Sequence, residues 1–444
     1  MKKYLKIHSQ FQTNRTRFVF DLVFMQLLGI DYEMVSETET AHIIYSKSFK
    51  NSSSITIPVC CDLLNSKGFE PMDVPYKNSG GETILFPNET PKSTEWNFDL
   101  FAAIFYLVSR YEEYKGFTPD AHHRFPPEAS ILHQTKSFEF PLVNIWVQKL
   151  KHQLLTQWPN LEFDEPKFRF ISTIDIDSTF QYKEKGFFWS LSGFLKDIIK
   201  GDFEEVGDRI KTLSGINKDA FGIYDELEIL HKENKTETIY FWLLGNYAKF
   251  DKNISWKNKR QAAVIQKLMK SNFYGIHPSY QSNYKEELLD KEIGRLQNIT
   301  QGYQKQLLSR QHFLIHQFPI TYQKLIKRGV AEDYTMGYTS QYGFRAGIAS
   351  PFYFYDLEKD EATNLLLYPF CSMDITPLHY YQLTPDQAIE KNRELLKKVK
   401  NVNGTFISLW HNESLSGRLR WKGGWKKVYE QLIIDAANIK DRLT

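Results

Sequence analysis

Cysteine is scarce in this chain, and the few cysteines present do not form a disulfide framework. The 444 residues contain three: Cys60 and Cys61 are neighbours, and Cys371 stands far from both. An odd, sparse set of this kind is typical of a reducing compartment rather than of a secreted, disulfide-stabilised domain. The sequence therefore predicts a cytoplasmic protein.

Long apolar runs and an excess of one charge are also missing. No apolar run approaches the roughly 20 residues that a helix needs to cross a bilayer, so we expect no membrane span. The apolar stretch 18–30 carries Asp21 and lacks a small-residue cleavage site, unlike a signal peptide. Lys and Arg number 56 against 53 Asp and Glu, and they form no basic stripe. Nucleic acid is therefore excluded as a partner.

The chain has the composition and length of a globular protein with two domains. Prolines 159 and 166 flank the expected boundary, which divides the chain into 1–160 and 161–444. Residues 1–160 are expected to form a separate α/β domain without a recognisable catalytic set. Two roles stay open for it: docking a partner or shaping a substrate groove. Its predicted strands are 40–45 and 54–59, and its predicted helices are 101–114 and 143–158.

Residues 161–444 alternate between apolar strands and amphipathic helices. This alternation predicts a parallel sheet that is either open or closed into a barrel. The predicted strands are 168–174, 238–244, 273–276, 311–315, 365–370 and 405–410, and the predicted helices are 261–270, 284–299, 321–328 and 384–400.

Two carboxylates at the end of the first of these strands give the sharpest chemical signal. Asp175 and Asp177 follow the apolar run 170–174, where parallel α/β folds keep their active sites. Residues two apart in a strand face the same side, so both carboxylates point into one mouth. Because like charges repel at close range, a bound cation is the simplest explanation of the pair.

Other titratable residues follow later strands or stand in glycine-flanked loops. His277 comes directly after a strand and suits zinc-like metals as a neutral imidazole. Arg345 lies between Gly343 and Gly347, and Asp374 and His411 follow the last two strands. Singly, each of these residues is more often structural, and their ordered recurrence carries the argument.

That order resembles the polysaccharide deacetylases of the NodB-homology type, over roughly residues 168–427. The matching motifs are the acid pair, His277-Pro278-Ser279, Phe344-Arg345-Ala346-Gly347, Asp374 and Leu409-Trp410-His411. The whole chain is similar to a bacterial subgroup of this family that has an extra N-terminal domain. The shared stretches of the subgroup are 107–114, 309–314 and 332–338.

The resemblance implies a distorted (β/α) barrel that binds a divalent metal, with zinc as the expected ion. It also implies hydrolysis of N-acetyl or O-acetyl groups on a glycan substrate, in surface or secreted polysaccharide synthesis. By position, the residues would take these roles: Asp175 the catalytic base, Asp177 and His277 metal ligands, Arg345 the partner of the base, His411 the general acid, and Asp374 the residue that orients it.

Two departures from the family pattern bear on the metal. Ile176 separates the two aspartates, which are adjacent in the family, and Gln281 stands where a second metal histidine is usual. A catalytic zinc site needs three protein ligands, so another residue must take that place. His312 is the leading candidate; His316, Ser282 and Asn283 are weaker ones.

Three rival interpretations stay open on sequence grounds. A haloacid-dehalogenase-type phosphatase also begins with Asp-x-Asp after a strand, but it needs a later acidic cluster, and the chain has no Asp-Asp dipeptide. Glycosyltransferases use Asp-x-Asp for a metal-nucleotide, which would leave His277, Arg345 and His411 unexplained. Finally, Gln281 is compatible with a degenerate barrel that binds a glycan or a partner protein without catalysis.

Overall fold

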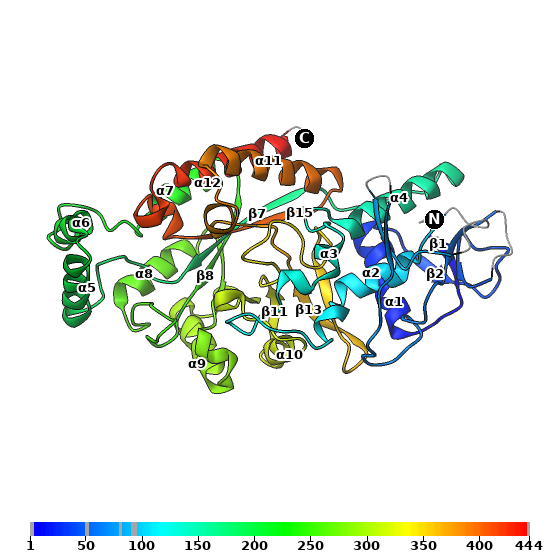
Figure 1. Cartoon of the computed structure of the whole chain (residues 1–444), viewed down its shortest axis with the longest axis horizontal. Coiled ribbons are helices and arrows are strands. Elements are labelled where there is room, and N and C mark those ends of the chain that lie inside the picture. The colour runs from blue at the N-terminus through cyan, green and yellow to red at the C-terminus, as the bar shows by residue number, and fades with distance from the viewer. Residues whose placement is uncertain (1–3, 49–52, 80–81, 90–95, 442–444) are drawn as a thin grey trace.

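A nine-stranded sheet forms the centre of the molecule (Figure 1). A computed structural model describes residues 4–48, 53–79, 82–89 and 96–441. The strand order is β12-β13-β11-β10-β9-β8-β7-β15-β14. The strands are β7 Arg169–Ile176, β8 Glu237–Trp242, β9 Phe273–Ile276, β10 Leu307–Ser309, β11 Val330–Asp333, β12 Phe352–Asp356, β13 Glu361–Leu367, β14 Ser372–Met373 and β15 Thr405–His411.

Neighbouring strands of this sheet run parallel, except for β12, which is antiparallel to β13. The carboxyl ends of the parallel strands therefore meet at one edge, which confirms the α/β class. Residues 368–371 join β13, near one end of the strand order, to β14 at the other end. No pairing between β12 and β14 closes the sheet within the described parts of the chain. Closure into a barrel thus stays a prediction.

Helices connect most of these strands and cover the sheet (Figure 1). The predicted helix 384–400 corresponds to α11. Thr384 caps it by accepting a hydrogen bond from Gln387 N–H, while the Gln387 side chain bonds back to the Thr384 N–H. Pro385 fits the first turn because its missing N–H has no partner there. The helices of this part are α7 Tyr224–Glu233, α8 Lys259–Leu268, α9 Glu286–Thr300, α10 Ile320–Lys327, α11 Pro385–Asn401 and α12 Trp425–Asp441.

Two further helices, α5 Phe187–Ile199 and α6 Phe203–Leu213, extend from the sheet on the side away from the N-terminal part (Figure 1). They lie between β7 and β8 in the chain. Among the residues that the structure describes, no helix combines the length and the apolar character that a bilayer crossing requires.

The N-terminal part has its own four-stranded parallel sheet, in the order β2-β1-β3-β4. The predicted strands 40–45 and 54–59 correspond to β3 and β4. The predicted helix 101–114 is shorter than expected: α2 ends at Val108 because Arg110 adopts a left-handed conformation with φ 52°. The elements are β1 Leu5–Ser9, α1 Asn14–Phe20, β2 Tyr32–Met34, β3 Ile43–Ser46, β4 Ile55–Pro58, β5 Tyr76–Ser79, β6 Glu82–Leu85, α2 Leu100–Val108, α3 Ile131–Gln134 and α4 Leu142–Gln157.

Buried ion pairs join the N-terminal part to the large sheet. Arg345 donates to both carboxylate oxygens of Glu113, at 2.9 and 2.5 Å, and Arg110 donates to the Arg345 carbonyl. All three side chains are at most 2% exposed. One continuous apolar core also includes residues of both parts. The division at residue 160 stays a prediction, since the two parts share this core.

Two expected strands were wrong in extent. The strand predicted at 311–315 is instead β10 at 307–309, followed by a 3-10 turn over His312–Leu314 in which Phe313 has φ 60°. The composition of 311–315 resembles that of a strand because several of its side chains are buried, but they are buried in a turn and the segment does not pair with a neighbouring strand. The strand predicted at 365–370 is β13, which begins four residues earlier and ends at Leu367.

Candidate metal centre

Two carboxylates stand at the carboxyl end of β7. Residues 170–176 are all buried, so packing on both faces fixes the direction of this strand. Asp175 lies within β7, in register with His411 of β15, and Asp177 follows the strand. Asp175 is 1% exposed, whereas the Asp177 side chain is 40% exposed. Asp177 is thus the more accessible of the two to a ligand.

His277 comes from the end of β9, two strands away from β7. Its backbone N–H donates to the carbonyl of Trp242 in β8, and its ring is almost fully buried. Nδ1 lies 2.6 Å from the carbonyl oxygen of Arg310 and donates its proton there. This contact leaves Nε2 as the ring nitrogen that can face a metal. This Nε2 lies 3.4 Å from Oδ1 of Asp177.

His312 comes from the 3-10 turn that follows β10. Its Nδ1 lies 2.8 Å from Oδ1 of Asp251, and its Nε2 lies 3.6 Å from Oδ2 of Asp177. A carboxylate behind a histidine fixes the ring and strengthens the opposite nitrogen as a ligand. Although the strand predicted here was wrong, the turn brings His312 to the Asp177 carboxylate.

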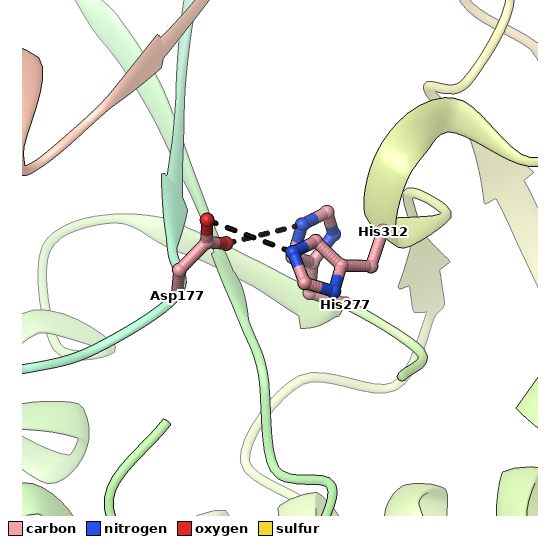
Figure 2. Close-up of side chains that lie close together, drawn as sticks. All are labelled: Asp177, His277 and His312. Carbon is pink, nitrogen blue, oxygen red and sulfur yellow. Dashed lines mark ion pairs between the residues drawn. The ribbon is translucent and has the colours of Figure 1, made fainter. Parts of the chain in front are cut away.

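Asp177, His277 and His312 form a group that could hold a metal ion (Figure 2). One ligand atom from each residue lies within 4.8 Å of the others. Two ligands at ~2.1 Å from a tetrahedral zinc ion would be ~3.4 Å apart, close to the observed 3.4 and 3.6 Å from Asp177 to the imidazoles. Oδ1 of Asp177 and Nε2 of His277 are buried without a hydrogen-bond partner, which a cation between them would supply. The three residues therefore fit a divalent metal of the zinc type.

The electrostatics of the group agree with this fit. Partial removal from water opposes the charge on Asp177, whose Oδ1 is buried, but the imidazoles of His312 and His277 hold the pKa of this carboxyl well below its usual range. Burial also disfavours a charged His312, yet the carboxylates of Asp177 and Asp251 raise its pKa to about 9. Without a metal, a proton on His312 therefore balances the negative charge.

Arg310, from the end of β10, holds Asp175. Its Nη1 donates to Oδ1 of Asp175 at 3.0 Å and to Oγ1 of Thr173 at 2.6 Å, and its Nε donates to the Tyr334 carbonyl. Arg310 is fully buried. Three fixed bonds leave the guanidinium no freedom to turn away from the carboxylate. Asp175 is therefore a carboxylate of fixed orientation beside the metal group.

The expected pairing of Arg345 with Asp175 is wrong. Arg345 binds Glu113 of the N-terminal part, as described above. The loop 343–347 packs against residues 138 and 139 and against Leu107, which turns its arginine toward Glu113 rather than toward β7. Arg310 takes the position beside Asp175 that the sequence had suggested for Arg345.

His411, which is partly exposed, and the buried Asp374 form a pair on the same edge of the sheet. Oδ2 of Asp374 accepts hydrogen bonds from Nδ1 and from the backbone N–H of His411, both at 2.9 Å. Burial by itself lowers the pKa of His411, but the carboxylate of Asp374 outweighs it, and the pKa rises to about 10. His411 is thus a protonated imidazole whose Nε2 is available to a ligand in the cleft.

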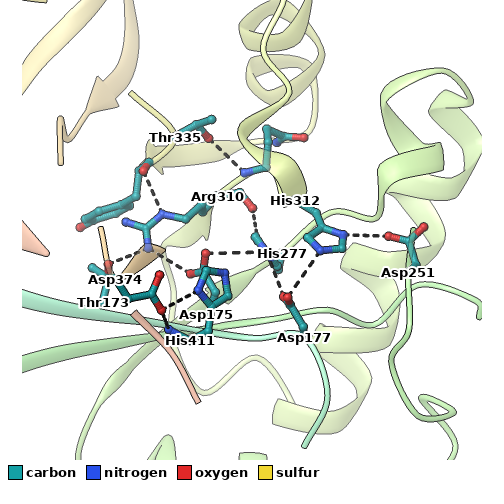
Figure 3. Close-up of polar contacts among 12 residues, drawn as sticks. Thr173, Asp175, Asp177, Asp251, His277, Arg310, His312, Thr335, Asp374 and His411 are labelled. Atoms are coloured by element: carbon teal, nitrogen blue, oxygen red, sulfur yellow. Dashed lines mark hydrogen bonds and ion pairs between the residues drawn. The ribbon is translucent and has the colours of Figure 1, made fainter. Parts of the chain in front are cut away.

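One cavity of about 260 Å³ unites these groups. Figure 3 shows the Arg310, Asp175, His277, His312 and Asp251 contacts, with Asp374 and His411 beside them. The lining contains six of the seven residues singled out from the sequence: Asp175, Asp177, His277, His312, Asp374 and His411.

The weaker candidates for the third ligand lie elsewhere. Gln281 is exposed outside the cavity lining. Ser282 donates its hydroxyl to the Ser279 carbonyl, and Asn283 bonds to the carbonyls of the same turn. His316 packs between Phe318 and Tyr322. Among these candidates, only His312 lies with Asp177 and His277 in the group that could hold a metal ion.

Two supporting residues, Arg310 and Asp251, escaped the sequence reasoning. Arg310 lies inside the stretch 309–314, which the resemblance marks only as shared with a family subgroup. Its place after a short strand was the available signal. Asp251 lies in the loop between β8 and α8, and nothing in the local sequence separates it from an ordinary surface acid.

Comparison with known proteins gives a match in the N-terminal part. Residues 5–159 match the model of a family of unknown function, DUF7033. No curated protein matches the sequence.

Solved structures share a limited likeness with the chain. A protein described as a polysaccharide deacetylase from Mycobacterium smegmatis has 14% identity and a TM-score of 0.39, over 63% of this chain and 87% of that one. The PuuE allantoinase has 12% identity and a TM-score of 0.37, over 60% and 84%. A protein described as a polysaccharide deacetylase from Pseudomonas aeruginosa PAO1 has 10% identity and a TM-score of 0.36, over 61% and 91%. A likeness at this level establishes neither a shared activity nor a shared substrate.

Proposed function

We propose that the chain is a metal-dependent hydrolase that removes acetyl groups, in the first place N-acetyl groups, from a glycan. One observation carries the proposal: a three-residue metal group, a carboxylate held by an arginine and a protonated histidine held by a carboxylate line a single cavity. Acyl hydrolysis needs these three elements: an electrophile, a base and an acid. The order of the motifs along the chain, which resembles polysaccharide deacetylases, supports the same reaction.

Asp177, His277 and His312 hold the metal, with zinc as the expected ion because two of the three donors are imidazoles. When bound, the ion polarises the acetyl carbonyl and acidifies a water molecule. Asp175 takes the proton from the attacking water, and the hydrogen bond from Arg310 keeps this carboxylate in place.

His411 completes the reaction on the leaving-group side. After water adds to the acetyl carbon, the bond from that carbon to the sugar nitrogen or oxygen breaks. An amine or alcohol leaves poorly as an anion, so His411 donates its proton to the departing atom. Asp374 keeps the imidazole charged until that step. The products are acetate and the deacetylated sugar.

The rival functions explain less of this cavity. A haloacid-dehalogenase-type phosphatase binds Mg²⁺, which prefers oxygen ligands, whereas two imidazoles face Asp177 here. A metal-nucleotide site of a glycosyltransferase would not explain why the His411–Asp374 pair lines the same cavity. A glycan-binding protein without catalytic activity is the remaining alternative, and the experiment below must distinguish it from the hydrolase. The cytoplasmic location suggested by the cysteine content belongs to this proposal as well.

The test combines metal analysis with acetate release. Purified full-length protein should contain about one zinc ion per chain and release acetate from N-acetylated amino-sugar oligomers. His277→Ala should lose both the zinc and the activity. His411→Ala should keep the zinc and lose most turnover, and His152→Ala, on an exposed face of α4, serves as the matched control. Zinc binding without acetate release from any acetylated glycan would favour the non-catalytic alternative.

A further inference from the structure

The helices α5 and α6 form a hairpin that exposes many apolar side chains. Of the 23 large apolar and aromatic side chains that are exposed in the described residues, eight lie between residues 191 and 216. The hairpin extends from the sheet on the side away from the N-terminal part (Figure 1), and none of the described residues that line the metal-centre cavity belongs to it. A monomeric protein in water rarely exposes so many apolar side chains together unless they bind something.

On α5, the exposed apolar side chains form a stripe along the helix. Leu191, Leu195, Ile198 and Ile199 follow one another at intervals of four, three and one residues, so they share one side of the helix. Ile199 is 84% exposed. In a surface helix the apolar side normally faces the core, so α5 presents to the outside the side that it would be expected to bury.

The second helix, α6, has a similar stripe. Phe203, Ile210 and Leu213 are exposed at intervals of seven and three residues, and the exposed Ile216 follows the helix. Phe203 is 73% exposed and lies four residues after Ile199. These two side chains therefore flank the turn 200–202, and we call residues 199–203 the hairpin tip.

The two helices contact each other through polar groups rather than through these stripes. Arg209 of α6 donates to Asp197 of α5 at 2.7 Å. The same guanidinium lies against Gly193 of α5, where a Cβ would be 2.8 Å from Nη1. It also lies over the ring of Tyr182, 4.5 Å from the ring centroid. Because an arginine, a carboxylate and a glycine meet between the helices, the exposed apolar side chains stay available to another surface.

The acidic side chains of the hairpin are engaged, whereas its lysines are not. The five acids of residues 187–213 have these partners within the chain: Asp197 with Arg209, Asp202 with the backbone N–H of Glu205, Glu204 with Lys422, Glu205 with Gln181 and Tyr182, and Asp208 with Arg418. By contrast, no carboxylate of the described residues pairs with Lys196, Lys200 or Lys211. Each of these exposed lysines directly follows an exposed apolar residue of a stripe. The hairpin thus presents apolar side chains together with uncompensated positive charge.

These features favour the surface of an anionic lipid bilayer as the partner of the hairpin. A bilayer interface takes apolar side chains among its acyl chains, while lysine ammonium groups reach the negatively charged headgroups. A second copy of the chain fits less well, because a symmetric contact through the same face would bring the same lysines of both copies together.

We infer that the α5–α6 hairpin docks the protein on an anionic membrane surface, with Ile199 and Phe203 of the hairpin tip inserted among the lipids. The lysines beside the stripes supply the attraction to the headgroups. This inference concerns a binding surface outside the metal centre and does not depend on the reaction proposed above.

Co-sedimentation of the full-length protein with lipid vesicles tests this inference. Wild type should bind vesicles made of equal parts phosphatidylglycerol and phosphatidylcholine at least about tenfold more strongly than vesicles of phosphatidylcholine alone, because three lysines are free to meet the anionic headgroups. Ile199→Glu and Phe203→Glu should each weaken binding to the anionic vesicles by at least about tenfold. Ile229→Glu is the matched control, since Ile229 is 59% exposed on α7, outside the hairpin, and this variant should bind as wild type does.

The outcomes decide between a membrane and other partners. Binding that about 1 M salt weakens and Ile199→Glu abolishes supports the inference, since such salt shortens the screening length to about 3 Å. If wild type stays in the supernatant with anionic vesicles, or if Ile229→Glu weakens binding as much as Ile199→Glu does, the inference is overturned. A lipid-free dimer that Ile199→Glu converts to a monomer in sedimentation velocity also overturns it, because the face would then join two copies of the chain.

Discussion

Nη1 of Arg310 lies 3.0 Å from Oδ1 of Asp175, and both side chains are almost fully buried. A buried carboxylate that loses its cation is left with an uncompensated charge, and the same carboxylate is the base of the proposed reaction. Arg310→Gln should therefore reduce kcat by about 10²-fold. The zinc content should equal that of wild type, because the Arg310 side chain is not one of the proposed metal ligands. The measurement is acetate release together with metal analysis.

Arg328→Gln is the matched control for this change, since Arg328 pairs with the exposed Asp290 and lies outside the cavity lining. It should keep the activity of wild type. Loss of zinc in Arg310→Gln would contradict the proposal that Arg310 positions Asp175 and has no part in holding the metal.

Asp251 should tune the metal through His312. Asp251→Asn keeps the shape of the side chain but removes the charge behind Nδ1 of His312. Loss of such a supporting carboxylate weakens zinc affinity by about 10- to 100-fold. Competition with a chromogenic chelator measures the affinity, and Asp225→Asn, at an exposed surface pair, should bind zinc as wild type does. An unchanged affinity would mean that His312 does not ligate the ion.

Zinc binding should release a proton and weaken as the pH falls. The pKa of His312 is raised to about 9 without a metal, so its imidazole is mostly protonated at neutral pH and must lose that proton to bind zinc. Apparent affinity should then fall by about tenfold per pH unit below 9. Calorimetry in two buffers of different ionisation enthalpy counts the protons released. Affinity independent of pH between 6 and 8 would be inconsistent with His312 as a ligand.

Asp374 should set the alkaline limit of activity. His411 must be protonated to act as the acid, and Asp374 raises its pKa, so activity is present below that pKa and lost as the pH rises through it. Asp374→Asn removes the charge and lowers the pKa of His411 toward its usual value near 6.5. The basic limb of the kcat/KM profile should move down by at least about one pH unit. A change in kcat without this movement would assign Asp374 a structural role alone.

Arg345 should matter for stability rather than as the partner of the base. Arg345→Gln leaves the buried Glu113 with one arginine instead of two and should lower the free energy of unfolding by about 3 kcal/mol. Burial opposes the charge on Glu113, but Arg345 and Arg110 hold its pKa at about 2. The contribution of the pair is therefore present at neutral pH and lost as the pH falls toward 2. Denaturant unfolding measures it; the exposed Lys47→Gln should change the free energy by less than about 1 kcal/mol.

Local pattern was enough to predict the residues that end strands. Asp175, Asp177, His277 and His411 each follow an apolar run, and the edge where parallel strands end brings them together. The cavity lining includes all four. For the third metal ligand, the sequence indicated only that one was needed and that His312 was the leading candidate. Strand pattern could not place His312, because the residues around it form a turn and not a strand.

The choice between two arginines could not be made from the sequence. Which guanidinium meets Asp175 depends on how β10 lies relative to β7, from which β9 and β8 separate it in the sheet. It also depends on a carboxylate, Glu113, more than 200 residues before Arg345. Both are tertiary facts without a local signature. For the same reason, nothing in residues 1–160 indicated that His122 and Arg124 line the cavity at the metal centre.

Arg124 belongs to the segment that matches a family of its own, yet its guanidinium is bonded to the backbone one residue after His312. The family match ends at residue 159, yet residues on both sides of that boundary line the cavity at the metal centre. A substitution in this segment would therefore reshape the cavity beside the ion and leave all three of its proposed ligands in place.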